Sequence, residues 1–131
     1  YGLFYEKVKA PVDLTKVRII PNPFKPYDKE GKSGKPDAGI IIDYIPDDLK
    51  EAKIYNIAGD LVADLKGDYL IHYDSTEPFT SPYSSYSRPP GVGLLYWRVK
   101  NNSGKRVASG VYLLVLKTDS KQITKKIAVI W

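Results

Sequence analysis

The chain has 131 residues, of which 43% are hydrophobic and 27% charged, the size and composition of one globular domain. Its net charge of +5 comes from basic residues scattered along the whole length, so we expect no nucleic-acid partner. Cysteine is absent, which excludes disulfides and thiol chemistry, and no apolar run is long enough for membrane insertion. Methionine is absent too, and we expect a mature product or a fragment of a longer protein.

In chain order, the sequence predicts a strand near the N-terminus and then short strands separated by turns rich in Gly, Pro, Asn and Asp. The predicted strands are residues 3–8, 17–20, 39–45, 53–57, 61–65, 69–73, 94–99, 111–117 and 123–131. Two long polar insertions, residues 25–38 and 66–93, separate some of them. This spacing predicts an all-β fold, an immunoglobulin-like antiparallel β-sandwich, with residues 1–14 as an extra N-terminal arm and residues 15–131 as the domain.

The last two predicted strands indicate which side chains share a face. Residues 123–131 alternate, so one face is predicted to hold Ile123, Lys125, Ile127, Val129 and Trp131. Residues 111–116 are apolar or aromatic at every position, which is typical of a strand buried on both faces at the centre of a sandwich. Gly59 and Gly110 are expected at tight turns that a β-carbon would obstruct.

The sequence gives little support for catalysis. His72, the single histidine, lies in an apolar strand, where an outward-facing structural residue is more common than half of a catalytic dyad. No nucleophile, phosphate-binding or zinc motif is present. Asp28, Glu30 and Asp37 lie in one Gly-containing loop, and their carboxylate oxygens are ligands that suit calcium. Their spacing does not match an EF-hand, so a solvated loop is favoured. We expect a non-enzymatic protein without a cofactor.

The second insertion holds two kinds of candidate site. Tyr83 and Tyr86 have the rigid amphipathic rings that form contact surfaces, and an inert loop is an equal alternative. Ser75 and Thr76 follow Asp74 in a triplet that resembles a bacterial O-glycosylation site, although so short a pattern also arises by chance.

Four segments, taken in order, resemble a family of bacterial C-terminal β-sandwich domains. This family includes the Ig-like domain of the flagellar hook-capping protein and the type A C-terminal sorting domains of type IX secretion. The matching segments are residues 17–24 with Pro-Asn-Pro, 54–62, 102–112 with Ala-Ser-Gly-Val-Tyr, and 126–130. The chain departs from the family after Trp97, where the Asp-Gly that usually follows is missing.

The resemblance implies a non-enzymatic structural module that is secreted to the cell surface. Three interpretations remain open, and each has its own partner: other copies of the chain in a homopolymer, the secretion machinery, or a cell-surface glycan. The first is a filament subunit in which an N-terminal strand pairs with a neighbouring copy through Leu3, Phe4, Tyr5 and Val8. The second is a C-terminal sorting or anchoring domain of a larger secreted protein. The third is a carbohydrate-binding accessory domain.

Overall fold

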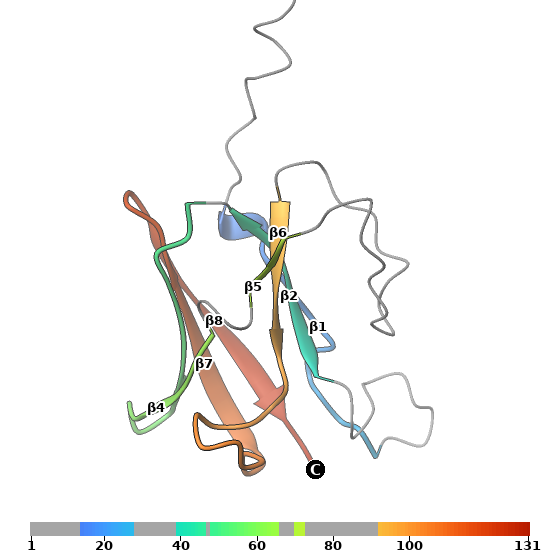
Figure 1. The fold of residues 1–131 in the computed structure, drawn as a ribbon. Helices are drawn as coiled ribbons and strands as arrows, with labels where there is room; N and C mark the ends of the chain where they lie inside the picture. Colours follow the sequence, from blue (N-terminus) through green and yellow to red (C-terminus); the bar gives the residue numbers. More distant parts are fainter. Residues whose placement is uncertain (1–13, 28–38, 47, 66–69, 73–91) are drawn as a thin grey trace, which may run out of the picture.

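The computed structural model describes residues 14–27, 39–46, 48–65, 70–72 and 92–131. They form one short 3-10 turn and eight strands, so the predicted all-β class is confirmed (Figure 1). The elements are η1 (Leu14–Lys16), β1 (Arg18–Ile20), β2 (Ile40–Pro46), β3 (Glu51–Asn56), β4 (Leu61–Asp64), β5 (Leu70–His72), β6 (Val92–Trp97), β7 (Gly110–Lys117) and β8 (Gln122–Val129).

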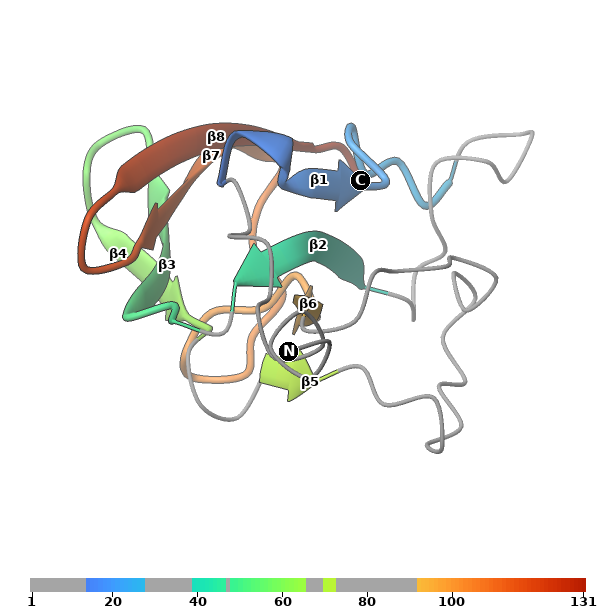
Figure 2. The same cartoon turned by 90° about the horizontal axis from the view of Figure 1, so that it is seen from above.

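The strands form two four-stranded antiparallel sheets that lie face to face (Figures 1 and 2). The first sheet has the order β1-β2-β6-β5 and the second the order β4-β3-β7-β8. In immunoglobulin constant domains the same positions are held by strands A-B-E-D and C-F-G, and β4 adds a strand beside the one equivalent to C. The topology therefore confirms an immunoglobulin-like sandwich.

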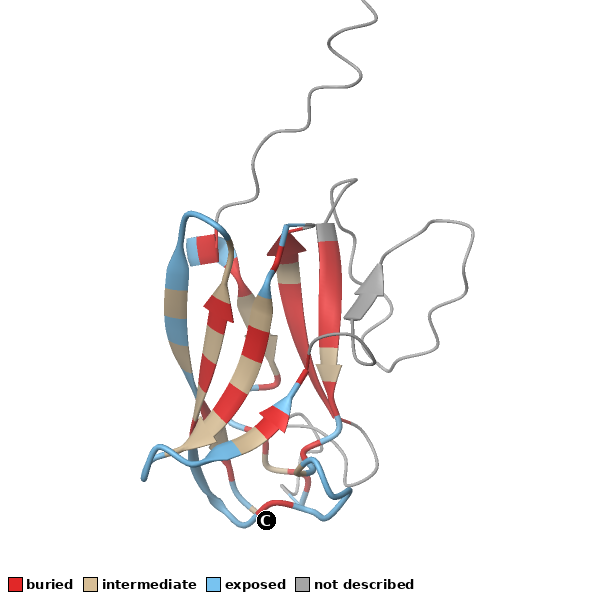
Figure 3. Cartoon of the chain, turned by 60° about the vertical axis from the view of Figure 1, so that its left-hand side comes forward, coloured by how far each residue is buried: buried red, intermediate tan, exposed pale blue. Residues whose placement is uncertain are grey.

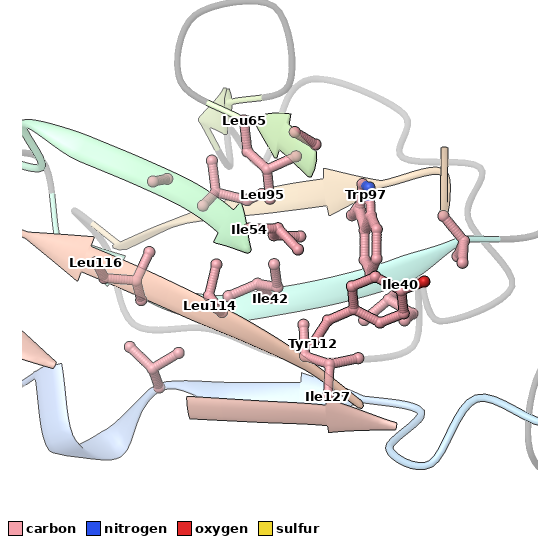
Figure 4. Packing of buried hydrophobic residues seen from close by; sticks show 14 of the residues in the cluster. Ile40, Ile42, Ile54, Leu65, Leu95, Trp97, Tyr112, Leu114, Leu116 and Ile127 are labelled. Atoms are coloured by element: carbon pink, nitrogen blue, oxygen red, sulfur yellow. The ribbon is translucent and has the colours of Figure 1, made fainter. Parts of the chain in front are cut away.

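The core fills the space between the sheets with large apolar side chains (Figure 4). β7 contributes Tyr112, Leu114 and Leu116, all of which are buried. On β8, Ile127 and Val129, which are predicted to share a face, are both buried, whereas the intervening side chains are more exposed. The core members from the other strands are Ile40, Ile42, Ile45, Ala52, Ile54, Ala63, Leu95 and Trp97.

The outward face of β7 differs from the prediction. Val111 is exposed, and Leu113 and Val115 are only partly buried. The prediction of a strand buried on both faces is wrong, because the second sheet is one layer of a two-layer sandwich and turns its other face to solvent. Figure 3 shows the resulting alternation of buried and more exposed residues along the strands.

The segment Pro21-Asn22-Pro23 moves the chain from one sheet to the other. β1 pairs with β2 in the first sheet, and four residues after β1 ends Phe24 pairs in parallel with Val129, at the end of β8. Proline suits this passage because it has no N–H to leave unpaired where one ladder ends. The fully buried Phe24 side chain anchors the crossing in the core.

The turn before β7 is fixed by a buried tyrosine. The Tyr112 hydroxyl donates a hydrogen bond to the carbonyl of Ala108, four residues upstream, at 2.6 Å. This geometry matches the tyrosine corner of immunoglobulin-like domains. Burial raises the pKa of the Tyr112 hydroxyl. The ring packs edge-on against Trp97, with centroids 5.8 Å apart, and so ties the corner to the first sheet.

The two glycines predicted at tight turns behave differently. Gly59 has φ +88° in the β3–β4 turn, a conformation that costs glycine little, so the tight turn is confirmed. The expected obstruction is not found, because an added β-carbon would meet nothing within 4 Å beyond its chain neighbours. Gly110 is the first residue of β7, and an added β-carbon would meet nothing nearer than a Tyr112 ring carbon at 3.9 Å. The prediction for Gly110 is wrong, because the chain already extends as a strand there.

Candidate interaction surfaces

Most residues singled out from the sequence lie outside the described part of the chain. These are Leu3, Phe4, Tyr5, Val8, Asp28, Glu30, Asp37, Ser75, Thr76, Tyr83 and Tyr86. His72 ends β5 and pairs with Gly93. Within the described residues, no group of three or more His, Cys, Asp or Glu side chains converges on a common point. None of the helices in that same part is long and apolar enough to cross a membrane.

The outer edge of β4 is covered by an asparagine. The backbone N–H of Asn102 donates to the Val62 carbonyl at 3.0 Å, and the Asn102 side-chain oxygen accepts the N–H of Asp64 at 3.0 Å. Asn102 thus uses one backbone and one side-chain group where a paired strand would use two backbone groups. The Val62 carbonyl and the Asp64 N–H are therefore satisfied without another strand.

A second asparagine covers the outer edge of β8. The Asn22 amide nitrogen donates to the Lys126 carbonyl at 2.9 Å, and its oxygen accepts the N–H of Ala128 at 3.1 Å. Phe24 continues the cover, since its N–H donates to Ala128 at 2.8 Å and its carbonyl accepts the N–H of Ile130 at 2.9 Å. Both edges of the second sheet are therefore capped over part of their length, which opposes the addition of a foreign strand.

The first sheet differs from the second on its outward face. Ile41 and Leu94 are buried although they stand outside the central core cluster. Asp43 is also fully buried and forms an ion pair with Arg18, with 3.1 Å between Oδ2 and Nη2. Its other oxygen accepts the N–H of Tyr44 at 2.9 Å, and the Arg18 guanidinium stacks over the Tyr44 ring at 4.6 Å. These contacts offset the cost of burying the carboxylate.

Trp131 joins three parts of the chain at one end of the sandwich. Its indole N–H donates to the Val107 carbonyl at 2.6 Å, and its backbone N–H donates to the Ser109 hydroxyl at 2.9 Å. The ring meets Phe24 edge-on at 5.5 Å between centroids, and Arg106 lies 3.9 Å above it. Because the indole N–H, the backbone N–H and the ring of Trp131 have partners within the chain, the cluster works as a structural clasp.

The outward face of the second sheet combines apolar residues with charges. Tyr55, Leu61 and Leu113 lie side by side across β3, β4 and β7. Toward the other end, Lys117 lies 3.2 Å from Glu51. That hydrogen bond, with the charges of Lys117 and Lys53, lowers the pKa of Glu51. The carboxylate is exposed, so the pair adds little to stability.

Sequence reasoning missed both asparagine caps. Asn22 stands between two prolines and Asn102 stands in Asn-Asn-Ser-Gly, and both patterns were interpreted only as corners or turns. The signal in each case is an asparagine next to a predicted edge strand, because a side-chain amide carries both a donor and an acceptor.

The fold has a counterpart among solved structures. This chain is similar to a segment of PorZ, an essential bacterial surface component of the type-IX secretion system of Porphyromonas gingivalis. The similarity has a TM-score of 0.57 and 22% sequence identity and covers 90% of this chain but 12% of the PorZ chain. No protein-family model and no curated protein matches the sequence significantly. The shared feature is therefore the fold.

Proposed function

We propose that this chain is a non-enzymatic β-sandwich module that acts at the bacterial cell surface in type IX secretion, as a sorting or anchoring domain of a larger protein. The observation that carries the proposal is a fold shared with part of a type-IX surface component over 90% of the chain. The four segments that resemble type A sorting domains support it independently, because they point to the same pathway from the sequence.

The geometry separates fold-forming residues of the motif from those available to a partner. In residues 102–112, Asn102 caps β4 and Tyr112 forms the corner. Ser103 and Lys105 are exposed in the turn between them. Recognition by an export machine therefore falls to the exposed turn, while the rest of the motif holds the turn in place.

Export of a reporter tests this function. Residues 1–131 are fused to the C-terminus of a reporter that carries an inner-membrane export signal, and the fusion is expressed in a type IX-competent host. We expect the reporter at the cell surface, and periplasmic retention in the same host without the secretion system. Lys105→Glu should reduce surface delivery, whereas Lys50→Glu, an equally charged change on the other side of the domain, should not. Equal delivery with and without the secretion system would contradict the proposal.

A second candidate function is self-assembly into a filament through residues 1–10. The capped edges of the second sheet favour a donor strand adding to the first sheet, which ends in the three-residue strands β1 and β5. Negative-stain microscopy of the full chain should then show polymers, and deletion of residues 1–10 should remove them. Polymers that persist after the deletion would contradict strand donation.

A further inference from the structure

The outward face of the second sheet gathers most of the exposed apolar side chains. In the described residues, five large hydrophobic side chains are exposed, and four of them lie on this face or at its hairpin end: Ile57 (78%), Leu61 (48%), Val111 (42%) and Ile130 (45%). The partly buried Tyr55, Leu113 and Val115 extend the same apolar surface along β3 and β7. Surfaces of this kind usually mark an interaction site.

The two edges of this face carry opposite charges. Register places Asp64, on edge strand β4, opposite Lys53, and places Lys126, on edge strand β8, opposite Leu113. Both Asp64 and Lys126 are exposed. The face thus has an acidic residue at one edge and a basic residue at the other. Between them lie the apolar side chains of Tyr55, Leu113 and Val115 and the charged side chains of Glu51, Lys53 and Lys117.

We propose that this face packs against the same face of a second copy of the chain, about a two-fold axis parallel to the strands. Such an axis sets β4 of one copy over β8 of the other, so the edge that carries Asp64 meets the edge that carries Lys126, with the two residues offset by two positions along the strands. It also sets β3 over β7, which brings Tyr55 of one copy to Leu113 of the other. By the same register Glu51 of one copy meets Lys117 of the other, while Lys53 meets Val115 and Lys126 lays its alkyl stem over Leu61. For the second sheet, whose edges are capped over part of their length, face-to-face packing is favoured over the addition of a strand.

The size of the face sets the expected strength. Four strands about 4.8 Å apart over the length of residues 111–117 give a face of roughly 450 Å² per copy. Stable interfaces bury about 800 Å² per partner, so this pairing is weak and depends on concentration. Tethering at a surface would raise the local concentration enough to populate it. The inference goes beyond the proposed function and does not depend on it.

Sedimentation equilibrium of residues 1–131 over a micromolar to millimolar series tests the pairing. We expect a reversible monomer–dimer equilibrium that Ile57→Glu weakens by roughly tenfold or more. Ile57 is almost fully exposed, so this variant should fold, which circular dichroism verifies. Tyr27→Glu is the matched control, since Tyr27 is 61% exposed and lies outside the four strands of this sheet, where its ring packs against Trp131. A monomer at every concentration would overturn the proposal and leave the face to a partner of different sequence.

A charge exchange distinguishes the proposed axis from non-specific apolar association. Lys126→Glu and Asp64→Lys should each weaken the dimer, because each places like charges together at the paired edges. The double variant should restore most of the affinity, since the edges are again opposite in sign. Failure of the double variant to recover, with all three variants folded, would overturn the two-fold arrangement.

Discussion

The two sheets of this sandwich handle their outward faces in opposite ways. The first sheet buries Ile41, Leu94 and the Asp43 carboxylate, which pairs with the partly exposed Arg18, whereas the second exposes Ile57, Leu61 and Val111. Both sheets contain a strand that is apolar at consecutive positions. The difference teaches that a strand that is apolar at consecutive positions has two faces that favour burial. Such a strand does not indicate that residues of the same domain bury both faces.

The inward and outward sides of β7 offer the largest expected contrast. Leu114→Ala should lower the free energy of unfolding by about 2 to 5 kcal/mol, because it leaves a cavity between the sheets. Its neighbour Leu113→Ala, on the outward face, should cost less than about 1 kcal/mol. Urea unfolding of the dilute monomer measures both. Similar losses would show that the outward face is as closely packed as the core.

Two glycines extend the contrast to the backbone. A β-carbon on Gly39, just before β2, would lie 2.2 Å from the Trp97 carbonyl oxygen, so Gly39→Ala should cost about 2 to 4 kcal/mol. Gly110→Ala, at the start of β7, should change stability by no more than about 0.5 kcal/mol. Thermal unfolding of the two variants compares them. A tolerated Gly39→Ala would contradict the tight approach of β2 and β6.

The predictions above depend on structural features, some of which can be predicted from the sequence and some of which cannot. Alternation and turn residues predicted the class, most strands and which side chains of β8 share a face, because a side-chain period of two follows directly from strand geometry. The sequence did not predict the edge caps. Asn22 and Asn102 act on strands far from them in the chain, and local turn chemistry explains both residues equally well.

The candidate surface was also predictable only in part. Residues 111–116 reveal an apolar outward side, but the pairing of β3 with β4 and β7 decides that Leu61, Tyr55 and Leu113 become neighbours. Register between distant strands depends on the whole fold, and a single sequence does not fix it.

The edge caps predict a smaller effect. Asn102→Ala removes the acceptor for the N–H of Asp64 and should lower the free energy of unfolding by about 1 kcal/mol. Ser103→Ala, at the adjacent exposed position, is the control and should be nearly neutral. Amide hydrogen exchange should also become faster at Asp64 in the Asn102 variant. Unchanged exchange there would mean that the side chain does not close the edge.

The tyrosine corner predicts the smallest effect at neutral pH. Tyr112→Phe removes one hydrogen bond to Ala108 and should cost about 1 kcal/mol. Because burial raises the pKa of Tyr112 in the folded state, the unfolded chain loses this proton at lower pH. The stability that Tyr112 contributes is therefore complete below about pH 10 and falls as pH rises beyond it. Above that pH, the free energy of unfolding should fall less steeply with rising pH for Tyr112→Phe than for the unaltered chain.

Hydroxyl-radical footprinting as a function of concentration tests the contrast between the sheets most directly. In dilute protein we expect modification at Ile57, Leu61 and Leu113 on the second sheet and protection at Ile41 and Leu94 on the first. At high concentration the modification of the second sheet should decrease, while the first sheet stays protected. Protection of both faces in dilute protein, or modification of the second sheet that never changes with concentration, would contradict the account.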